Sequence, residues 1–148
     1  GIRSSIVRLF SVYGPGLRKQ LLWDICQRVS DNPANLTLSG NGSEERDWLE
    51  VIDACRLLII AGERTSEECQ VINGGTGFGI SVREIASKLI ELWSVETSLV
   101  FNSETRKGDP KFLVADITRA KDSGFSPLVD WETGLSDYVA WFKDSKIE

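Results

Sequence analysis

The sequence has 148 residues, of which 41% are hydrophobic and 26% are charged, with a formal net charge of −5. That length suits one domain with a hydrophobic core that needs no disulfide bonds. No apolar run approaches the roughly 20 residues that cross a bilayer, and the basic residues form only small groups, so the sequence argues against a membrane protein and a nucleic-acid partner.

The first third of the chain alternates between strand and helix patterns. Residues 5–12 are dense in β-branched and aromatic side chains, which predicts a strand buried on both faces. Glycine and proline at 13–16 interrupt it, and apolar spacing predicts a helix over 17–29. A short strand at 36–38 then runs into a turn at 40–42.

Residues 46–61 fit two patterns. The apolar positions from Trp48 to Ile59 have helical spacing throughout. Alternatively, Asp53 is an N-cap that separates a short strand at 48–50 from a helix at 54–61.

The rest of the chain continues the alternation. Ser81 and Glu84 form a capping-box pattern, and Asp116 and Asp130 are each placed to cap a helix. The expected strands are 69–73 and 99–101, and the expected helices are 81–93, 116–124 and 130–142. Alternating strands and helices predict an α/β fold.

The glycine-rich stretch at 74–79 lies between a predicted strand and a predicted helix, where dinucleotide-binding proteins hold a pyrophosphate. The spacing does not fit, because the third glycine of the G-x-G-x-x-G pattern falls on Ile80. The acidic residue nearest the expected ribose position, Glu96, precedes the next strand instead of ending one. A tight structural turn is therefore the better interpretation.

Arg46 and Arg106 are candidates for a phosphate clamp, because both lie in loop-like settings and arginine binds phosphate oxygens in pairs. Local salt bridges with neighbouring aspartates are the alternative. Tyr13, in its Gly-Pro loop, is better placed than Tyr138 to contact a ligand.

Some residue types are absent or few. There is no histidine, which excludes a histidine-based triad or metal site. The cysteines Cys26, Cys55 and Cys69 are odd in number and widely spaced, which indicates buried free thiols in a reducing compartment, the cytoplasm. There is no methionine, so we expect a fragment of a longer protein.

Four segments in series resemble the extended short-chain dehydrogenase/reductases, the NAD-dependent nucleotide-sugar epimerases and dehydratases. RLFSVYGPG at 8–16 is similar to that family's R-x-F-N-V-Y-G-P segment. GNGSEERDWLEVIDACRLL at 40–58 resembles its G-x-G-x-x-x-R-D-F-x-x-V-x-D-x-A segment. VINGGTGFGISVREIASKL at 71–89 and RKGDPKFLVADITRAKDSGFSPLVDWETGL at 106–135 resemble the family's later segments.

The resemblance implies the C-terminal half of such an enzyme, with residues 1–16 ending a Rossmann-like sheet and 17–148 forming a small α/β substrate-binding lobe. The family's glycine-rich NAD loop and catalytic Tyr-x-x-x-Lys pair precede this region. Neither of the two tyrosines starts that motif here, because Leu17 and Phe142 stand at the lysine positions, so we expect no catalytic residue in this chain.

The resemblance also implies roles for particular residues. Leu9 and Phe10 would lie near the nicotinamide of NAD, and Leu21 would offer its backbone N–H to the substrate diphosphate. Ser11 replaces an asparagine that contacts the diphosphate in the family, which weakens that contact. The remaining substrate-binding positions are Thr37 and Ser39 at the nucleotide base, and Arg46 and Arg106 at the diphosphate.

We therefore predict the substrate-recognition part of an NAD-dependent nucleotide-sugar epimerase or dehydratase, inactive by itself, which binds a nucleoside diphosphate sugar. One alternative is a free-standing dinucleotide-binding module that uses the 74–79 loop. Another is a non-catalytic interaction module, because a strand at 5–12 without sheet neighbours invites pairing between chains and a homo-oligomer.

Overall fold

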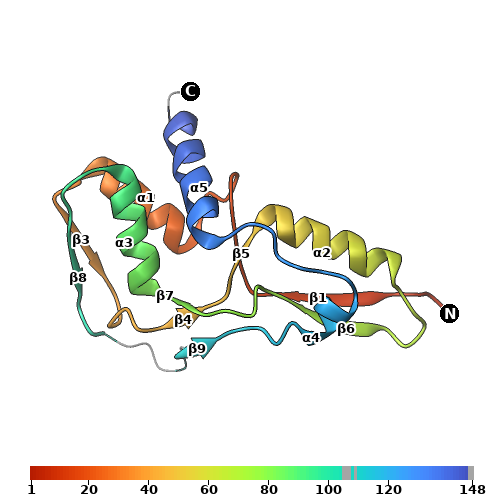
Figure 1. Ribbon diagram of the computed structural model, residues 1–148. Helices are drawn as coiled ribbons and strands as arrows, with labels where there is room; N and C mark the ends of the chain where they lie inside the picture. The colour runs from red at the N-terminus through yellow and green to blue at the C-terminus, as the bar shows by residue number, and fades with distance from the viewer. Residues whose placement is uncertain (105–107, 109, 147–148) are drawn as a thin grey trace.

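Strands and helices alternate along the chain, as predicted, in the computed structural model, which describes residues 1–104, 108 and 110–146 (Figure 1). None of the helices in this described part has the length and apolar content that crossing a membrane takes. The elements in chain order are β1 (Ser5–Leu9), β2 (Ser11–Tyr13), α1 (Gln20–Asp31), β3 (Asn35–Leu38), β4 (Glu45–Arg46), β5 (Trp48–Glu50), α2 (Val51–Glu63), β6 (Gln70–Gly74), β7 (Ile80–Ser81), α3 (Val82–Trp93), β8 (Ser98–Phe101), β9 (Phe112–Leu113), α4 (Thr118–Asp122) and α5 (Trp131–Ser145).

One part of the structure is a parallel pair of strands between helices. β1 and β6 run in parallel from Ser5 opposite Gln70 to Leu9 opposite Gly74. Figure 1 shows α2 along one side of this pair and α4 on the other. Parallel neighbours need a crossover, which the intervening chain with α2 provides.

The strand predicted over residues 5–12 is two strands, which corrects the sequence interpretation. At Phe10 the chain changes partner: the Phe10 N–H donates to the Gly74 carbonyl, and β2 then pairs with β5. The prediction that both faces are buried is also wrong for β1, since Ile6 is 50% exposed. Within the described residues, β1 pairs on one edge only, with β6.

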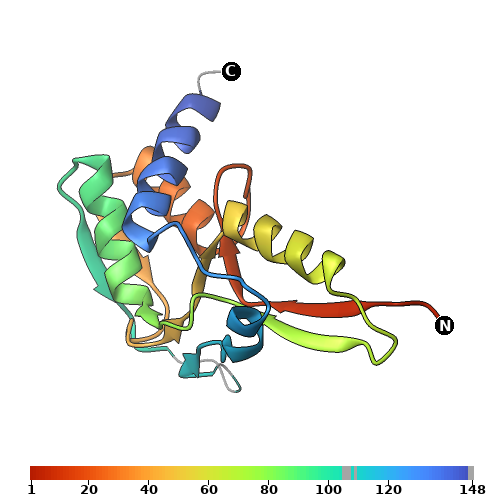
Figure 2. The ribbon, with the colours of Figure 1, turned by 45° about the vertical axis from the view of Figure 1, so that its right-hand side comes forward.

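The second part packs three helices against a parallel pair of strands. Figure 2 shows α1, α3 and α5 side by side, and Figure 1 shows β3 and β8 at the outer edge. Their core combines aliphatic and aromatic side chains, and Phe142 contacts the rings of both Trp23 and Trp93. The predicted capping box of Ser81 and Glu84 at the start of α3 is confirmed.

Two predicted helix starts show different outcomes. The Asp130 carboxylate accepts from the N–H groups of Glu132 and Thr133, so it caps α5 as predicted. The helix predicted from residue 17 begins at Gln20 instead, because the Leu17 N–H closes a turn on the Gly14 carbonyl.

The ambiguity at 46–61 resolves as a strand followed by a helix. β5 and α2 have this order, but the cap is Glu50, whose carboxylate accepts from the Ile52 N–H at 2.5 Å. Asp53, predicted as the cap, lies inside the first turn of α2 and is fully buried.

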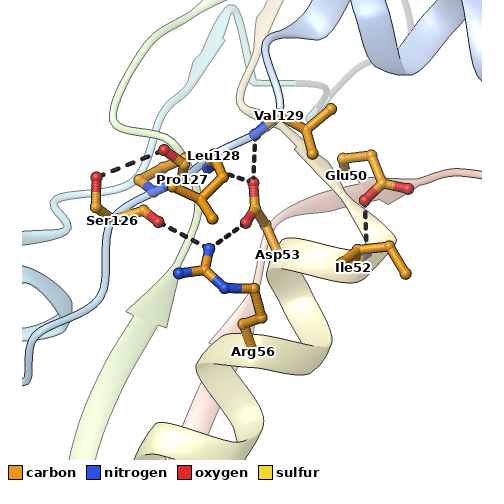
Figure 3. A network of polar contacts seen from close by, with 8 residues as sticks. All are labelled: Glu50, Ile52, Asp53, Arg56, Ser126, Pro127, Leu128 and Val129. Carbon is orange, nitrogen blue, oxygen red and sulfur yellow. Dashed lines mark hydrogen bonds and ion pairs between the residues drawn. The ribbon is translucent and has the colours of Figure 1, made fainter.

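Asp53 instead joins α2 to the segment before α5. Its carboxylate accepts from the backbone N–H groups of Leu128 at 2.8 Å and Val129 at 2.9 Å, and pairs with Arg56 at 2.6 Å (Figure 3). Arg56 in turn donates to the Ser126 carbonyl. The side chain that looked like a local cap is therefore a tertiary contact.

The cysteines are free, as predicted, but only Cys26 is buried; Cys55 is exposed and Cys69 is intermediate. Burial raises the pKa of the Cys26 thiol to about 11, which keeps it protonated near neutral pH.

We expect a maleimide reagent to label Cys55 rapidly in the native protein and Cys26 only after unfolding. Mass spectrometry of digested, time-quenched samples measures this, and equal labelling rates would contradict it.

Candidate functional site

Two backbone N–H groups of the glycine loop at 74–79 donate to a side chain of the protein itself. The fully buried Asp47 carboxylate accepts from the backbone N–H groups of Thr76 at 2.6 Å and Gly77 at 2.9 Å. It also accepts from the Thr76 hydroxyl at 2.8 Å and the Ala115 N–H at 3.1 Å.

An internal carboxylate therefore stands where a dinucleotide pyrophosphate would need these donors. Gly75 permits this close approach, because an added Cβ would overlap the Asp47 carboxylate and lie 2.6 Å from the Ala115 Cβ. The loop is a structural turn, and its geometry does not fit the alternative of a free-standing dinucleotide-binding module.

A cavity of about 650 Å³ lies between α1, β3, the loop after β3, and β4. Its volume is in the range of small-molecule sites, roughly 300–1,000 Å³. The structure brings four of the predicted substrate-binding residues together around it: Leu21, Thr37, Ser39 and Arg46. These residues come from three different elements and the loop.

The walls of this cavity are held by a glycine turn, by hydrogen bonds to backbone carbonyls and by one side-chain contact with a ring. The predicted turn at 40–42 is present: Gly40 and Gly42 have φ of +84° and +81°, a conformation that favours glycine. The Gly40 N–H donates to the Glu104 carbonyl at 2.9 Å. Arg83 lies 4.3 Å from the Phe101 ring centre and donates to the Asn41 carbonyl at 2.7 Å.

Cationic side chains gather on the side of the cavity formed by β4 and the start of β9. Arg46 donates from Nη1 to the carbonyls of Glu45 and Pro110, both at 2.8 Å, which fixes its guanidinium. Lys111 also lines the cavity. An arginine fork and a lysine point charge together are a typical phosphate-binding set.

Sequence reasoning missed several lining residues, among them Asp24, Arg28 and Lys111. Helical spacing was a usable signal for the first two, because Leu21, Asp24 and Arg28 stand at i, i+3 and i+7 on one face of α1. Lys111 belongs to a small basic group in the sequence, of a size that suits phosphates on a small ligand, but its place at the cavity depends on the pairing of β9 with β4.

Other predicted site residues lie elsewhere. Leu9, Phe10 and Ser11 occupy the junction between β1 and β2 and do not line this cavity. Tyr13 does not face a ligand site: it is buried, its hydroxyl donates to the Trp131 carbonyl at 3.3 Å, and burial raises its pKa. Arg106 lies outside the described residues.

These features define a Rossmann-like α/β chain with a polar cavity lined by both cationic and acidic side chains. Residues 1–75 match the model of the NAD dependent epimerase/dehydratase family, and the chain belongs to that family. The NAD dependence of that family agrees with the predicted cofactor.

Curated relatives and solved structures of this family resemble most of the chain. A dTDP-glucose 4,6-dehydratase of Streptomyces griseus is 29% identical over 143 residues, which cover 96% of this chain and 43% of the relative. The UDP-glucose 4-epimerase of Thermotoga maritima, solved with UDP-glucose, superposes with a TM-score of 0.86 at 27% identity, covering 98% of this chain and 47% of the epimerase.

A UDP-glucuronic acid 4-epimerase of Bacillus cereus, in complex with UDP-glucuronic acid and NAD, has a TM-score of 0.84 at 27% identity, over 95% of this chain and 45% of that chain. The chain thus spans less than half the length of the relatives it matches.

Proposed function

We propose that this chain is the substrate-binding portion of an NAD-dependent nucleotide-sugar epimerase or dehydratase, and that its 650 Å³ cavity holds the nucleoside diphosphate. The observation that carries the proposal is the convergence of Leu21, Thr37, Ser39 and Arg46 on one cavity. Relatives solved with UDP-glucose or UDP-glucuronic acid support this class of ligand.

The diphosphate lies at the cationic side, between Arg46 and Lys111, together with Arg106. Leu21 adds a donor, because it is the second residue of α1, whose first N–H groups have no partner inside the helix. The Lys19 side chain does not cap these groups, which leaves the positive end of the helix for an anion. The base then lies toward Thr37 and Ser39.

The cofactor contact is proposed at the end of β1, where Leu9 and Phe10 border the nicotinamide. Leu9 is partly exposed at the carboxyl end of a parallel strand, the edge at which such folds bind ligands. The Phe10 N–H does not bind the cofactor, because it donates to the Gly74 carbonyl. Bound NAD supplies the hydride chemistry.

Ser11, the remaining predicted substrate contact, is half-buried beside Trp48 in the β2–β5 pair. Because serine is shorter than the asparagine it replaces, its role toward the diphosphate is at most secondary.

We expect no turnover of a nucleotide sugar by these 148 residues, since neither tyrosine begins a Tyr-x-x-x-Lys motif. The free cysteines favour a reducing compartment, the cytoplasm.

Titration calorimetry of the chain with UDP-glucose and dTDP-glucose tests the binding proposal. We expect saturable binding that weakens about tenfold in Lys111→Ala and is lost in Arg106→Ala, because each removes a cation from the diphosphate. Added salt should weaken binding to the unaltered chain. The control is Lys121→Ala on the exposed side of α4. Equal affinities for Lys111→Ala, Arg106→Ala and the control would contradict the proposal.

A further inference from the structure

The lining of the nucleotide cavity has a feature that bears on how a base is held. Among the described residues that line it there is no phenylalanine, tyrosine or tryptophan. Proteins commonly hold an unpaired base by stacking it on an aromatic ring or on an arginine plane. The cavity therefore needs a different flat surface if it binds a nucleotide.

Arg28 on α1 provides such a surface. Its Nη1 lies 3.2 Å from the Asp24 carboxylate, one turn earlier on the helix, and its Nη2 donates to the Thr37 carbonyl at 2.5 Å. These two partners hold the guanidinium by both terminal nitrogens, so its plane is fixed. The side chain is still 41% exposed, which leaves room against the plane.

Three other arginines of the described chain already lie near aromatic rings. Arg83 lies over Phe101, and Arg56 and Arg18 contact the rings of Phe125 and Trp141. Within the same described residues no ring contact is found for Arg28. A delocalised, weakly hydrated guanidinium of this kind is suited to stack on a π-system.

We propose that the guanidinium plane of Arg28 is the platform on which the base of the nucleoside diphosphate stacks. This inference rests on the proposed function, and it places the base about two helical turns along α1 from Leu21, away from the cations proposed to hold the phosphates. Arg28 touches Thr37, a residue predicted for the base, whereas Arg46 and Lys111 belong to β4 and the chain entering β9.

The proposal has two consequences. A positive charge alone does not replace Arg28, because lysine has no plane. A purine also gains more from the platform than a pyrimidine, because its π-face is larger.

The test compares UDP, GDP and inorganic pyrophosphate by calorimetry with the unaltered chain and Arg28→Lys. This variant keeps the charge and removes the plane. We expect it to bind both nucleotides about 5- to 100-fold more weakly, with the larger loss for GDP, and to bind pyrophosphate as before. Arg119→Lys is the matched control, because Arg119 also donates to a backbone carbonyl, that of Val71, at 3.0 Å.

A second measurement uses only the unaltered chain and does not depend on a variant that folds. Ribose 5-diphosphate, which has no base, should bind at least about fivefold more weakly than UDP. Unchanged nucleotide affinity in Arg28→Lys would overturn the platform while leaving the proposed function in place. Equal losses for pyrophosphate and nucleotides would also overturn it, and no binding of any nucleotide to the unaltered chain would overturn both proposals.

Discussion

Replacing Asp47 with alanine is expected to lower the free energy of unfolding by about 3–5 kcal/mol. The carboxylate is fully buried and accepts four hydrogen bonds, from Thr76, Gly77 and Ala115. Without it, these donors remain away from water with no acceptor, and each unsatisfied buried group costs about 1–3 kcal/mol. Partial relaxation of the loop keeps the total below the full sum.

Asp116 offers a matched control at the surface. Its carboxylate also accepts from a threonine N–H and hydroxyl, those of Thr118 at 3.0 and 2.6 Å, but the residue is exposed. Water can replace the carboxylate there, so Asp116→Ala should destabilise the protein much less than Asp47→Ala. Urea unfolding followed by tryptophan fluorescence measures both variants. Similar losses in the two would show that burial of Asp47 does not control the effect.

Replacing Gly134 with alanine is expected to destabilise the protein by about 1–3 kcal/mol, although alanine is the better helix former. Gly134 lies in the first turn of α5, where a Cβ would overlap the Tyr13 hydroxyl and come within 2.9 Å of its ring carbon Cζ. Tyr13 is buried and held by its bond to the Trp131 carbonyl, so it has little room to move. The steric cost therefore exceeds the gain in helix propensity.

Gly62 provides the opposite case within α2. No atom lies within 4 Å of the position that its Cβ would take. Gly62→Ala should therefore stabilise the protein by up to about 1 kcal/mol through helix propensity alone. Thermal unfolding of the two variants measures the difference in sign. A stabilised Gly134→Ala variant would mean that β2 and α5 separate at little cost.

The expected effect at Asp47 bears on the cavity as well as on stability. Asp47 follows Arg46 directly, and its backbone N–H donates to the Leu113 carbonyl at 3.0 Å. The buried carboxylate thus helps to fix the chain that carries Arg46 into the cavity wall. A destabilised Asp47 variant should lose ligand affinity together with its fold.

Local signals in the sequence predicted local structure well. The capping box of Ser81 and Glu84 and the cap at Asp130 involve groups three residues apart or fewer, so they depend little on the rest of the chain. The glycine turn at 40–42 is similar, because positive φ there is a property of the residue type.

Predictions failed where distant residues compete for the same group. Asp53 has the chemistry of a cap, but its carboxylate bonds to Leu128 and Val129, 75 and 76 residues away. Tyr13 has the loop position of a ligand contact, yet its hydroxyl bonds to a residue 118 positions later. The strand at 5–12 divides because the Phe10 N–H still donates to Gly74, whereas the Ser11 N–H donates to the Asp47 carbonyl.

The sequence by itself determined the α/β class, the order of the elements and, through its motifs, the resemblance to a family to which the chain belongs. Only the tertiary structure decided that the glycine loop closes on Asp47, and that Arg28 and Lys111 line one cavity with Leu21 and Arg46. Residue type and short spacing set the local conformation. Packing between segments far apart in the chain sets which partner each polar group finds.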